Sequence, residues 1–288
     1  MLKREDTLAI CIPIHGWSFH IEKLLTHFSS HKDVRIQRAP VFVTNSGPSV
    51  PPNNISSFKN LKIIPVASNF YWAKAVEILY KECIQLTPKA VLLMNHDCLP
   101  SKDAIELLLN EFDEHTIVHP LLVNEKNHNE VIWSGLSYRF GRSFVQQSFL
   151  DKQMCYETDA APGQMLLMPF SAINIKYLHS NLFPHYYADH VQTYQMKKAG
   201  YRLLVNKLAI AYSNQDDVVI KEKRQHVKTL NGLFSSLFAP YSTINIKAKF
   251  FFPYFVQKTI VGAFIYSITY TSWAILKSLL GYLRNFLS

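Results

Sequence analysis

The chain has 288 residues, of which 48% are hydrophobic and 18% are charged, a composition that excludes a disordered polypeptide and allows one sizeable core. Its net charge of +9 is uneven, because the last 68 residues hold nine Lys and Arg and a single acid, Glu222. These cations are interleaved with a long apolar segment and accompany no nucleic-acid motif, so nucleic acid is not an expected partner.

The cysteines and the N-terminal residues indicate a compartment. Four cysteines are widely separated without a CxxC pair, which argues against a zinc knuckle and a disulfide framework. The opening "MLKREDTLAICIPIHG" offers no hydrophobic region and cleavage site of a secretory signal. We therefore expect a chain that stays inside the cell, in a reducing environment.

Apolar strand patterns alternate with helical patterns through the first 120 residues. The predicted strands cover residues 8–14, 39–45, 61–67 and 90–95, and the predicted helices cover 19–30, 71–86 and 101–112. Ser101 is the predicted N-cap of the last of these helices. Continuous apolar runs such as "AVLLMN" suit a parallel sheet covered on both faces, so this half is predicted to be a Rossmann-like open sheet.

The second half continues with fewer elements. We expect a strand in "MLLMP" (165–169), a helix through Val191 and Lys198 that ends at Gly200, and a strand at 201–206. Asp189 falls in the first turn of that helix, where a carboxylate is favoured by the helix dipole.

Eighteen uncharged residues, "TIVGAFIYSITYTSWAIL", lie between Lys258 and Lys277. Aromatic residues and cations flank an apolar stretch that is slightly short for a membrane span. We expect a helix that lies on anionic lipid, and the alternatives are a true span and a packed terminal or dimer helix.

The stretch "MNHDCLP" follows a predicted strand, and it places Asn95, His96 and Asp97 at the strand's carboxyl end. Ligands bind beyond these ends in open α/β sheets, so the three side chains are candidates for a site. The sequence contains neither GxGxxG after the first strand nor GxxxxGK[ST], which leaves dinucleotide oxidoreductases and P-loop proteins without support.

Six segments, taken in order, resemble the family 2 glycosyltransferases of bacteria, particularly the rhamnosyltransferase-like enzymes that build surface polysaccharide. The segments are "IPIHGW", "VTNSG", "SNFYWAKAVEILY", "LLMNHDCLP", "TDAAPGQMLLMP" and "PHYYADHVQTYQMKKAGY". The resemblance implies an α/β fold of the GT-A type, with a mostly parallel central sheet flanked by helices. It implies a glycosyltransferase domain at 1–220, with a nucleotide-sugar half at about 1–120 and an acceptor half at about 121–220. A basic, aromatic-rich helical extension at 221–288 would associate with a membrane or dimerise.

The resemblance matches Asp97 to the closing carboxylate of an Asp-x-Asp-like motif, which holds Mg2+ or Mn2+ on the donor diphosphate. A divalent cation stabilises the charge that develops on the departing diphosphate. His96 occupies a position where the family commonly has an acid or a polar residue. The alternative for Asp97 is a loop carboxylate ahead of Ser101.

Asp189 matches the catalytic base of this family. An inverting transfer needs one carboxylate to accept the proton of the acceptor hydroxyl while that oxygen attacks the anomeric carbon. The alternative is that Asp189 only caps its helix. Gln195 stands where the family frequently has Arg or Lys.

The resemblance also implies ligand contacts. Those with the nucleotide and the donor are expected from Pro13, His15, Thr44, Asn45, Asn69, Trp72 and Asn95. Those with the donor sugar and the acceptor are expected from Asp159, Gly163 and Gln164. As alternatives, Trp72 is a core residue and residues 159–164 form a plain turn.

The resulting hypothesis is an inverting, metal-dependent hexosyl- or deoxyhexosyltransferase. It would use a UDP-, dTDP- or GDP-sugar and a lipid-linked or growing glycan acceptor in surface-polysaccharide assembly. The expected location is cytoplasmic, peripheral at the inner face of the cell membrane, and a homodimer is an option. The alternative is a catalytically inactive scaffold for glycan or partner proteins, since Thr44, His96 and Gln195 depart from the family pattern. A nucleotidyltransferase is less favoured, because its glycine-rich and basic first loop does not follow Ile14.

Overall fold

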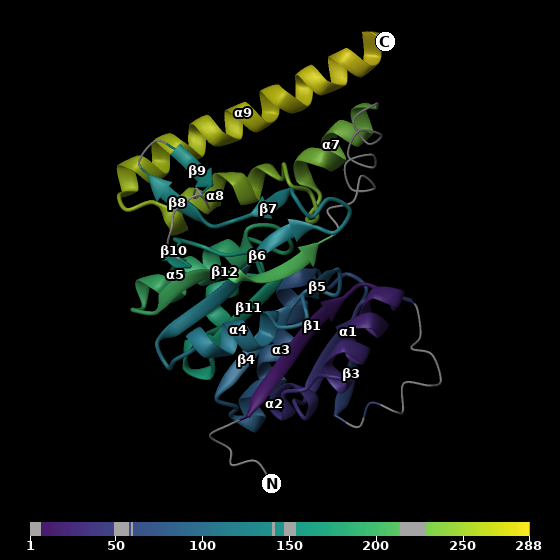
Figure 1. Ribbon diagram of the computed structural model, residues 1–288. Coiled ribbons are helices and arrows are strands. Elements are labelled where there is room, and N and C mark those ends of the chain that lie inside the picture. The colour runs from purple at the N-terminus through teal and green to yellow at the C-terminus, as the bar shows by residue number, and fades with distance from the viewer. Residues whose placement is uncertain are drawn as a thin grey trace.

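The computed structural model describes residues 7–48, 58, 60–139, 142–146, 154–213 and 229–287 (Figure 1). The strands are β1 (Leu8–Ile14), β2 (Val41–Asn45), β3 (Leu61–Pro65), β4 (Ala90–Met94), β5 (Cys98–Pro100), β6 (Thr116–Asn124), β7 (Val131–Trp133), β8 (Leu136–Arg139), β9 (Arg142–Gln146), β10 (Cys155–Glu157), β11 (Met165–Pro169) and β12 (Arg202–Ser213). The helices are α1 (Phe19–Ser29), α2 (Val34–Gln37), α3 (Trp72–Leu86), α4 (Ala104–Glu111), α5 (Ala188–Lys198), α7 (Leu230–Phe238), α8 (Ile246–Val256) and α9 (Ile260–Leu287), with two short 3-10 helices, η3 (Phe170–Ala172) and η4 (Ile175–Leu178).

One large sheet organises the chain, with the order β10-β12-β6-β11-β4-β1-β2-β3. β1 pairs in parallel with β2 and β4, β2 with β3, and β6 with β12. β11 runs antiparallel to both of its neighbours, β4 and β6. The mixed, mostly parallel sheet flanked by helices confirms the predicted fold class.

β1 shows why its sequence is apolar without alternation. Ala9 and Cys11 belong to a core cluster that includes residues of α3, α5 and α8. Ile10 and Ile12 point to the other face, where their cluster includes residues of α1 and α4. A strand covered on both faces has no position at which a polar side chain reaches water.

β6 is a strand that the sequence analysis did not predict, and it contains Pro120, a residue type that is disfavoured in central strands. The pairing with β12 moves from Asn206 opposite Pro120 directly to Ile210 opposite Leu121. The skipped residues bulge out, and the Asn206 Oδ1 accepts the N–H of Leu208 at 2.9 Å. The bulge accommodates the proline, and it lets β12 continue to Ser213, well past the predicted end at residue 206.

The predicted N-cap of the helix at 101–112 is wrong. α4 begins at Ala104, and Asp103 is its N-cap residue without a side-chain capping bond. The Ser101 carbonyl instead accepts the N–H of Ala104, and the Ser101 N–H donates to Ile210, because β5 pairs with β12 up to Pro100. Strand pairing therefore places Ser101 ahead of the helix start.

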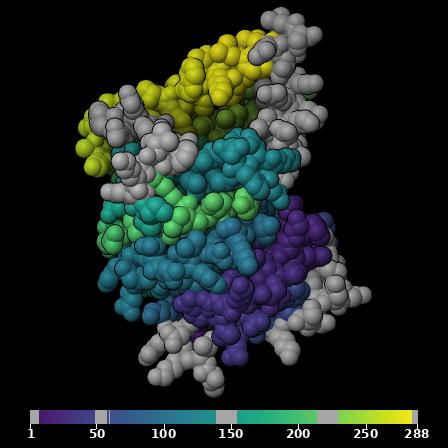
Figure 2. All heavy atoms as spheres, in the orientation of Figure 1, coloured from purple at the N-terminus to yellow at the C-terminus, as the bar shows by residue number. Residues whose placement is uncertain are grey.

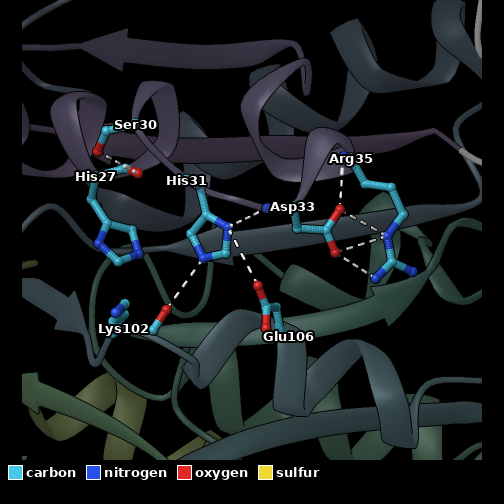
Figure 3. A network of polar contacts seen from close by, with 7 residues as sticks. All are labelled: His27, Ser30, His31, Asp33, Arg35, Lys102 and Glu106. Carbon is cyan, nitrogen blue, oxygen red and sulfur yellow. Dashed lines mark hydrogen bonds and ion pairs between the residues drawn. The ribbon is translucent and has the colours of Figure 1, made fainter.

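A histidine links the α1–α2 connection to the loop before α4 (Figure 3). The His31 Nδ1 accepts the N–H of Asp33 at 3.1 Å, so the ring carries its proton on Nε2, which is 3.3 Å from the Lys102 carbonyl. Glu106 Oε1 is 3.8 Å from the same Nδ1, which is already an acceptor. This cluster fastens two loops together and offers no open ligand position on His31.

The C-terminal helices pack on the second half of the sheet. Phe252 and Val256 of α8 are buried in the same core cluster as residues of α3 and α5. α9 packs on α8 and α7, at the end of the molecule opposite β1, α1 and β3 (Figure 1). In Figure 2, α9 forms a long edge of the surface. α8 therefore contributes to the core of the predicted catalytic domain, although it lies in the predicted extension.

Candidate active site

The carboxyl end of β4 holds a carboxylate that lacks a partner. Asp97 Oδ1 is buried and has no hydrogen-bond partner among the described residues. Its neighbour His96 is partly buried, and burial lowers the pKa of the imidazole, with the Asp97 charge opposing and His20 adding to the shift. An orphaned anionic oxygen inside the protein is costly, so this position favours a cation.

Four predicted site residues from three segments contact one another beside this strand end. The Trp72 Nε1 donates to Asn95 Oδ1 at 2.8 Å, and the Asn95 N–H donates to the Gln164 carbonyl at 2.9 Å. A Cβ on Gly163 would lie 2.2 Å from the Trp72 ring, so only glycine fits against the indole. Trp72 is thus a half-buried residue that joins α3, β4 and the 158–164 segment.

Asp189 joins this cluster through the main chain. Its Oδ2 accepts the N–H of Gly163 at 3.0 Å, and its Oδ1 accepts the N–H of His190 at 2.9 Å. Each carboxylate oxygen keeps one lone pair that these bonds do not use. Two backbone donors therefore fix the orientation of a half-buried carboxylate without consuming its capacity to accept a proton.

Tyr187, which sequence reasoning missed, immediately precedes α5. Its φ of 74° and ψ of −16° lie in the left-handed region, which costs a residue with a Cβ on the order of 1–3 kcal/mol. No sequence pattern reveals such a conformation, because tyrosine has no preference for it. The strained residue lies two positions before Asp189.

The ends of β1 and β2 form a second group of predicted residues. The Asn45 Oδ1 accepts the N–H groups of Gly16 and Gly47, both at 3.0 Å. His15 Nδ1 lies 3.0 Å from the Ser46 hydroxyl. Asn45 thus holds the two loops together, and the exposed His15 contacts the buried Ser46 between them. The signal for Ser46 and Gly47 was present in the "NSG" that follows the strand.

Three further residues were predicted to contact the nucleotide or the donor, namely Thr44, Pro13 and Asn69. Thr44 is fully buried and its Oγ1 has no hydrogen-bond partner among the described residues, and Pro13 is buried within β1. Asn69 lies in an exposed turn before α3. The ligand contacts predicted for these three residues stay predictions.

Asp159 is engaged with protein groups. Its Oδ2 accepts the N–H of Tyr138 at 2.7 Å, and its Oδ1 accepts from Lys197 Nζ at 2.9 Å. Gln195 points elsewhere, since its Nε2 is 3.5 Å from the Phe255 carbonyl of α8. Lys197, two residues after Gln195, donates to Asp159 Oδ1 and to the Thr158 carbonyl, both at 2.9 Å.

The kind and number of possible ligand atoms determine which metal ion this site suits. Among the described residues, no group of three or more His, Cys, Asp and Glu could hold a metal ion by itself. A single carboxylate with an unsatisfied oxygen fits Mg2+ or Mn2+, because such ions take one or two protein carboxylates and complete their shell with phosphate and water oxygens.

No family model matches the sequence, and no curated protein matches it. Many solved structures match, and three of them illustrate the shared fold. GalNAc-T7 with UDP, GalNAc and Mn2+ is 14% identical with a TM-score of 0.52, over 85% of this chain and 54% of that one. S. aureus TarS 1–349 is 14% identical with a TM-score of 0.55, over 96% of this chain and 91% of that one. The mannosyltransferase PcManGT from Pyrobaculum calidifontis, in complex with GDP-Man and Mn2+, is 11% identical with a TM-score of 0.52, over 97% of this chain and 86% of that one.

This chain spans about half the length of the GalNAc-T7 structure and most of the other two. At identities this low, the likeness concerns the fold alone. The chain has the fold of GT-A glycosyltransferases.

Proposed function

We propose that this chain is an inverting, metal-dependent glycosyltransferase that uses a nucleotide-sugar donor. The observation that carries the proposal is the buried, unsatisfied Oδ1 of Asp97 at the end of β4. The fold supports it, because GalNAc-T7 and PcManGT share this fold and their structures hold Mn2+ with UDP or GDP-Man. Contacts through Asn95, Trp72 and Gly163 connect this strand end to Asp189.

Asp97 would hold Mg2+ or Mn2+ together with the phosphates of the donor. When bound, the cation stabilises the negative charge that develops on the departing nucleoside diphosphate. Burial lowers the pKa of the neighbouring His96 imidazole, and the charge of Asp97 opposes this shift.

Asp189 would act as the base. The N–H groups of Gly163 and His190 hold the carboxylate in place, so the oxygen lone pairs that remain are aimed before an acceptor arrives. Asp189 takes the proton of the acceptor hydroxyl as that oxygen bonds to the anomeric carbon and the bond to the diphosphate breaks.

The donor and acceptor follow from the resemblance to family 2 enzymes. We propose a UDP-, dTDP- or GDP-linked hexose or deoxyhexose, bound at the β1 and β2 loops where His15 and Ser46 meet. The acceptor would be a lipid-linked or growing glycan of a bacterial surface polysaccharide.

The outer surface of α9 supports a location at the inner face of the cell membrane. Ten large apolar side chains between Ile260 and Leu283 are more than 40% exposed, and Trp273 is exposed by 61%. Within the described residues, α9 is also the one helix long and apolar enough to cross a membrane. Because α9 packs on α8 and α7 through its other face, we favour a helix that lies in the lipid interface. Lys277 is an exposed residue of α9, and Lys258 is exposed just before its start. Both would complement anionic headgroups.

A donor screen tests the enzyme proposal. Purified protein is incubated with UDP-, dTDP- and GDP-sugars and Mn2+ or Mg2+, with crude lipid or glycan acceptors, and release of nucleoside diphosphate is measured. The blank is the double variant Asp97→Ala/Asp189→Asn, which carries the same contaminants. We expect turnover of one donor class that EDTA abolishes. Nucleotide binding without turnover of any donor would favour the inactive scaffold.

The membrane proposal is tested by substitution, because truncation near residue 251 would also remove Phe252 and Val256 from the core. Ile265→Glu/Trp273→Glu changes two exposed side chains of α9. We expect this variant to stop sedimenting with vesicles that contain anionic lipid, whereas Glu114→Gln, far from α9 in sequence, continues to sediment. Unchanged sedimentation would contradict the proposal, and a variant that changes from dimer to monomer in light scattering would support a dimer helix instead.

A further inference from the structure

The backbone at Tyr187 determines how α5 begins. The Tyr187 carbonyl accepts the N–H of Val191 at 2.9 Å, and Asp189 follows two residues later. The left-handed φ of 74° would suit glycine, whereas tyrosine adopts it only where other contacts hold the residue there. The groups that hold Tyr187 therefore also influence where Asp189 points.

The Tyr187 hydroxyl has three partners, all from the C-terminal part of the chain. It accepts from Lys249 Nζ at 2.9 Å and donates to the Thr243 carbonyl at 3.1 Å. The Tyr270 hydroxyl lies 3.2 Å away. Because Tyr187 has one hydroxyl hydrogen and a carbonyl can only accept, Tyr270 is the donor in this last bond. The hydroxyl thus uses its full capacity on α8, on α9 and on the loop before α8.

Lys249 is unusual among these partners, because its side chain is buried with only 7% of the residue exposed. Its Nζ lies 3.9 Å from the centroid of the Tyr270 ring and 5.6 Å from that of Tyr187. None of the ion pairs among the described residues includes Lys249. Two aromatic rings and one hydroxyl therefore stabilise the buried ammonium, and it in turn fixes both rings.

The aromatic ring of Tyr187 also packs against α8. The Phe252 ring, on the next turn of α8, lies 4.8 Å from the Tyr187 ring and is fully buried. α8 contacts α5 on one side and α9 on the other, in the arrangement that Figure 1 shows. Tyr187 is therefore enclosed by two C-terminal helices through its ring as well as through its hydroxyl.

We propose that Lys249 and Tyr270 are positioning residues for Asp189. Their bonds to the Tyr187 hydroxyl hold the side chain of Tyr187, and the held side chain keeps its backbone in the left-handed region. That backbone determines where α5 begins, and so brings the Asp189 carboxylate to the N–H groups of Gly163 and His190. The role of Asp189 as a base rests on the proposed function, but the positioning itself does not. The C-terminal helices are then part of the frame of the active site, in addition to the membrane role proposed above.

The experiment compares two variants with two matched controls in the full-length chain. Tyr270→Phe removes one hydroxyl and keeps the ring on Lys249, and Lys249→Met removes the cation and keeps a long apolar side chain. The control Tyr266→Phe acts one turn earlier on α9, on a ring stacked on Tyr270 whose hydroxyl has no partner among the described residues. The control Lys247→Met removes an exposed lysine of α8.

The first measurement is hydrogen–deuterium exchange by mass spectrometry, which needs no substrate. We expect faster exchange in peptides covering residues 158–168 and 186–196 in both variants, and unchanged exchange in the peptide covering β1. With a donor that the screen identifies, kcat falls about 10-fold while the KM for the donor stays the same, because misplacement of the base affects the chemical step. The two controls behave as the wild type.

Unchanged exchange in these two peptides would overturn the proposal. Faster exchange throughout the chain, β1 included, would also overturn it, because Lys249 and Tyr270 would then serve only global stability. Local acceleration in a protein that turns over no donor would leave the positioning in place and refute the proposed function.

Discussion

Asp97 and Asp189 are both partly buried carboxylates, but their hydrogen bonding differs. Asp97 has a buried oxygen with no donor among the described residues. Both oxygens of Asp189 accept a main-chain N–H, and the backbone before it is held by α8 and α9. One oxygen of the first carboxylate has no hydrogen-bond partner in the described part of the chain, and the second carboxylate has a fixed direction.

This difference separates two kinds of chemistry. An unsatisfied buried acceptor costs about 1–3 kcal/mol, which binding of a cation offsets. Both oxygens of Asp189 already accept a main-chain N–H, so no unsatisfied oxygen there calls for a cation, and the fixed orientation suits proton transfer from a hydroxyl. Asp189 can therefore be tested by its effect on turnover, and Asp97 by its effect on metal-dependent nucleotide binding.

The largest expected effect is on turnover by Asp189→Asn. An amide cannot accept the proton, so kcat falls on the order of 10²–10⁴-fold, while the affinity for nucleotide with Mn2+ stays unchanged. Single-turnover kinetics and calorimetric titration with UDP or GDP measure the two quantities. Equal turnover by the variant would remove Asp189 as the base.

Asp97→Ala is expected to act on metal-dependent binding. The affinity for nucleotide in the presence of Mn2+ falls about 100-fold, since even partners of a metal ligand contribute 10–100-fold. Without metal, the melting temperature stays the same or rises, because the substitution removes an unsatisfied buried oxygen. A thermal-shift series with and without Mn2+ measures both, and Asp103→Ala is the control. A variant that Mn2+ and nucleotide still stabilise fully would contradict the metal role.

Gly163→Ala changes the glycine that lies against the Trp72 ring and donates its N–H to Asp189. The new methyl would lie 2.2 Å from the Trp72 ring, which is also held by Asn95. We expect a loss of about 2 kcal/mol in the free energy of unfolding from this overpacking. Urea denaturation measures it, and the double variant Gly163→Ala/Trp72→Leu should recover part of the loss if the clash with the indole is the cause.

The smallest effect is a pH dependence from His119, a fully buried residue of β6 whose ring packs on Trp133. Burial lowers its pKa to about 3, against carbonyls of Pro120 and Pro162 that raise it, while nearby His190 lowers it further. In the unfolded chain the imidazole of His119 binds a proton near pH 6.5, whereas in the folded chain it stays neutral at that pH. The contribution of His119 to the free energy of unfolding is therefore complete above pH 6.5 and is lost as the pH falls. We expect a decrease of about 1 kcal/mol between about pH 7.5 and about pH 5.5. His119→Gln, which does not titrate, should show a correspondingly smaller decrease in urea denaturation.

Local pattern was sufficient for part of the elements. The strands β1, β2, β3 and β4 and the helices α1, α3 and α5 lie close to their predicted ranges, because continuous apolar runs, helical spacing and flanking turn residues are local signals. β6 was missed and the cap at Ser101 was wrong, since both depend on β12, which is more than 80 residues away in the chain.

The sequence by itself determined that this is an α/β chain with a carboxylate after β4, a carboxylate at the start of α5 and a basic, apolar C-terminal helix. Composition, periodicity and motif order carry that information, because they are properties of neighbouring residues. Only the tertiary structure decided that Thr44 is buried, that Asp159 pairs with Lys197, and that Lys249 holds Tyr187. Those outcomes depend on which side chains meet across the fold. Their energies come from burial and from hydrogen bonds between residues far apart in the sequence, so no local pattern of residues predicts them.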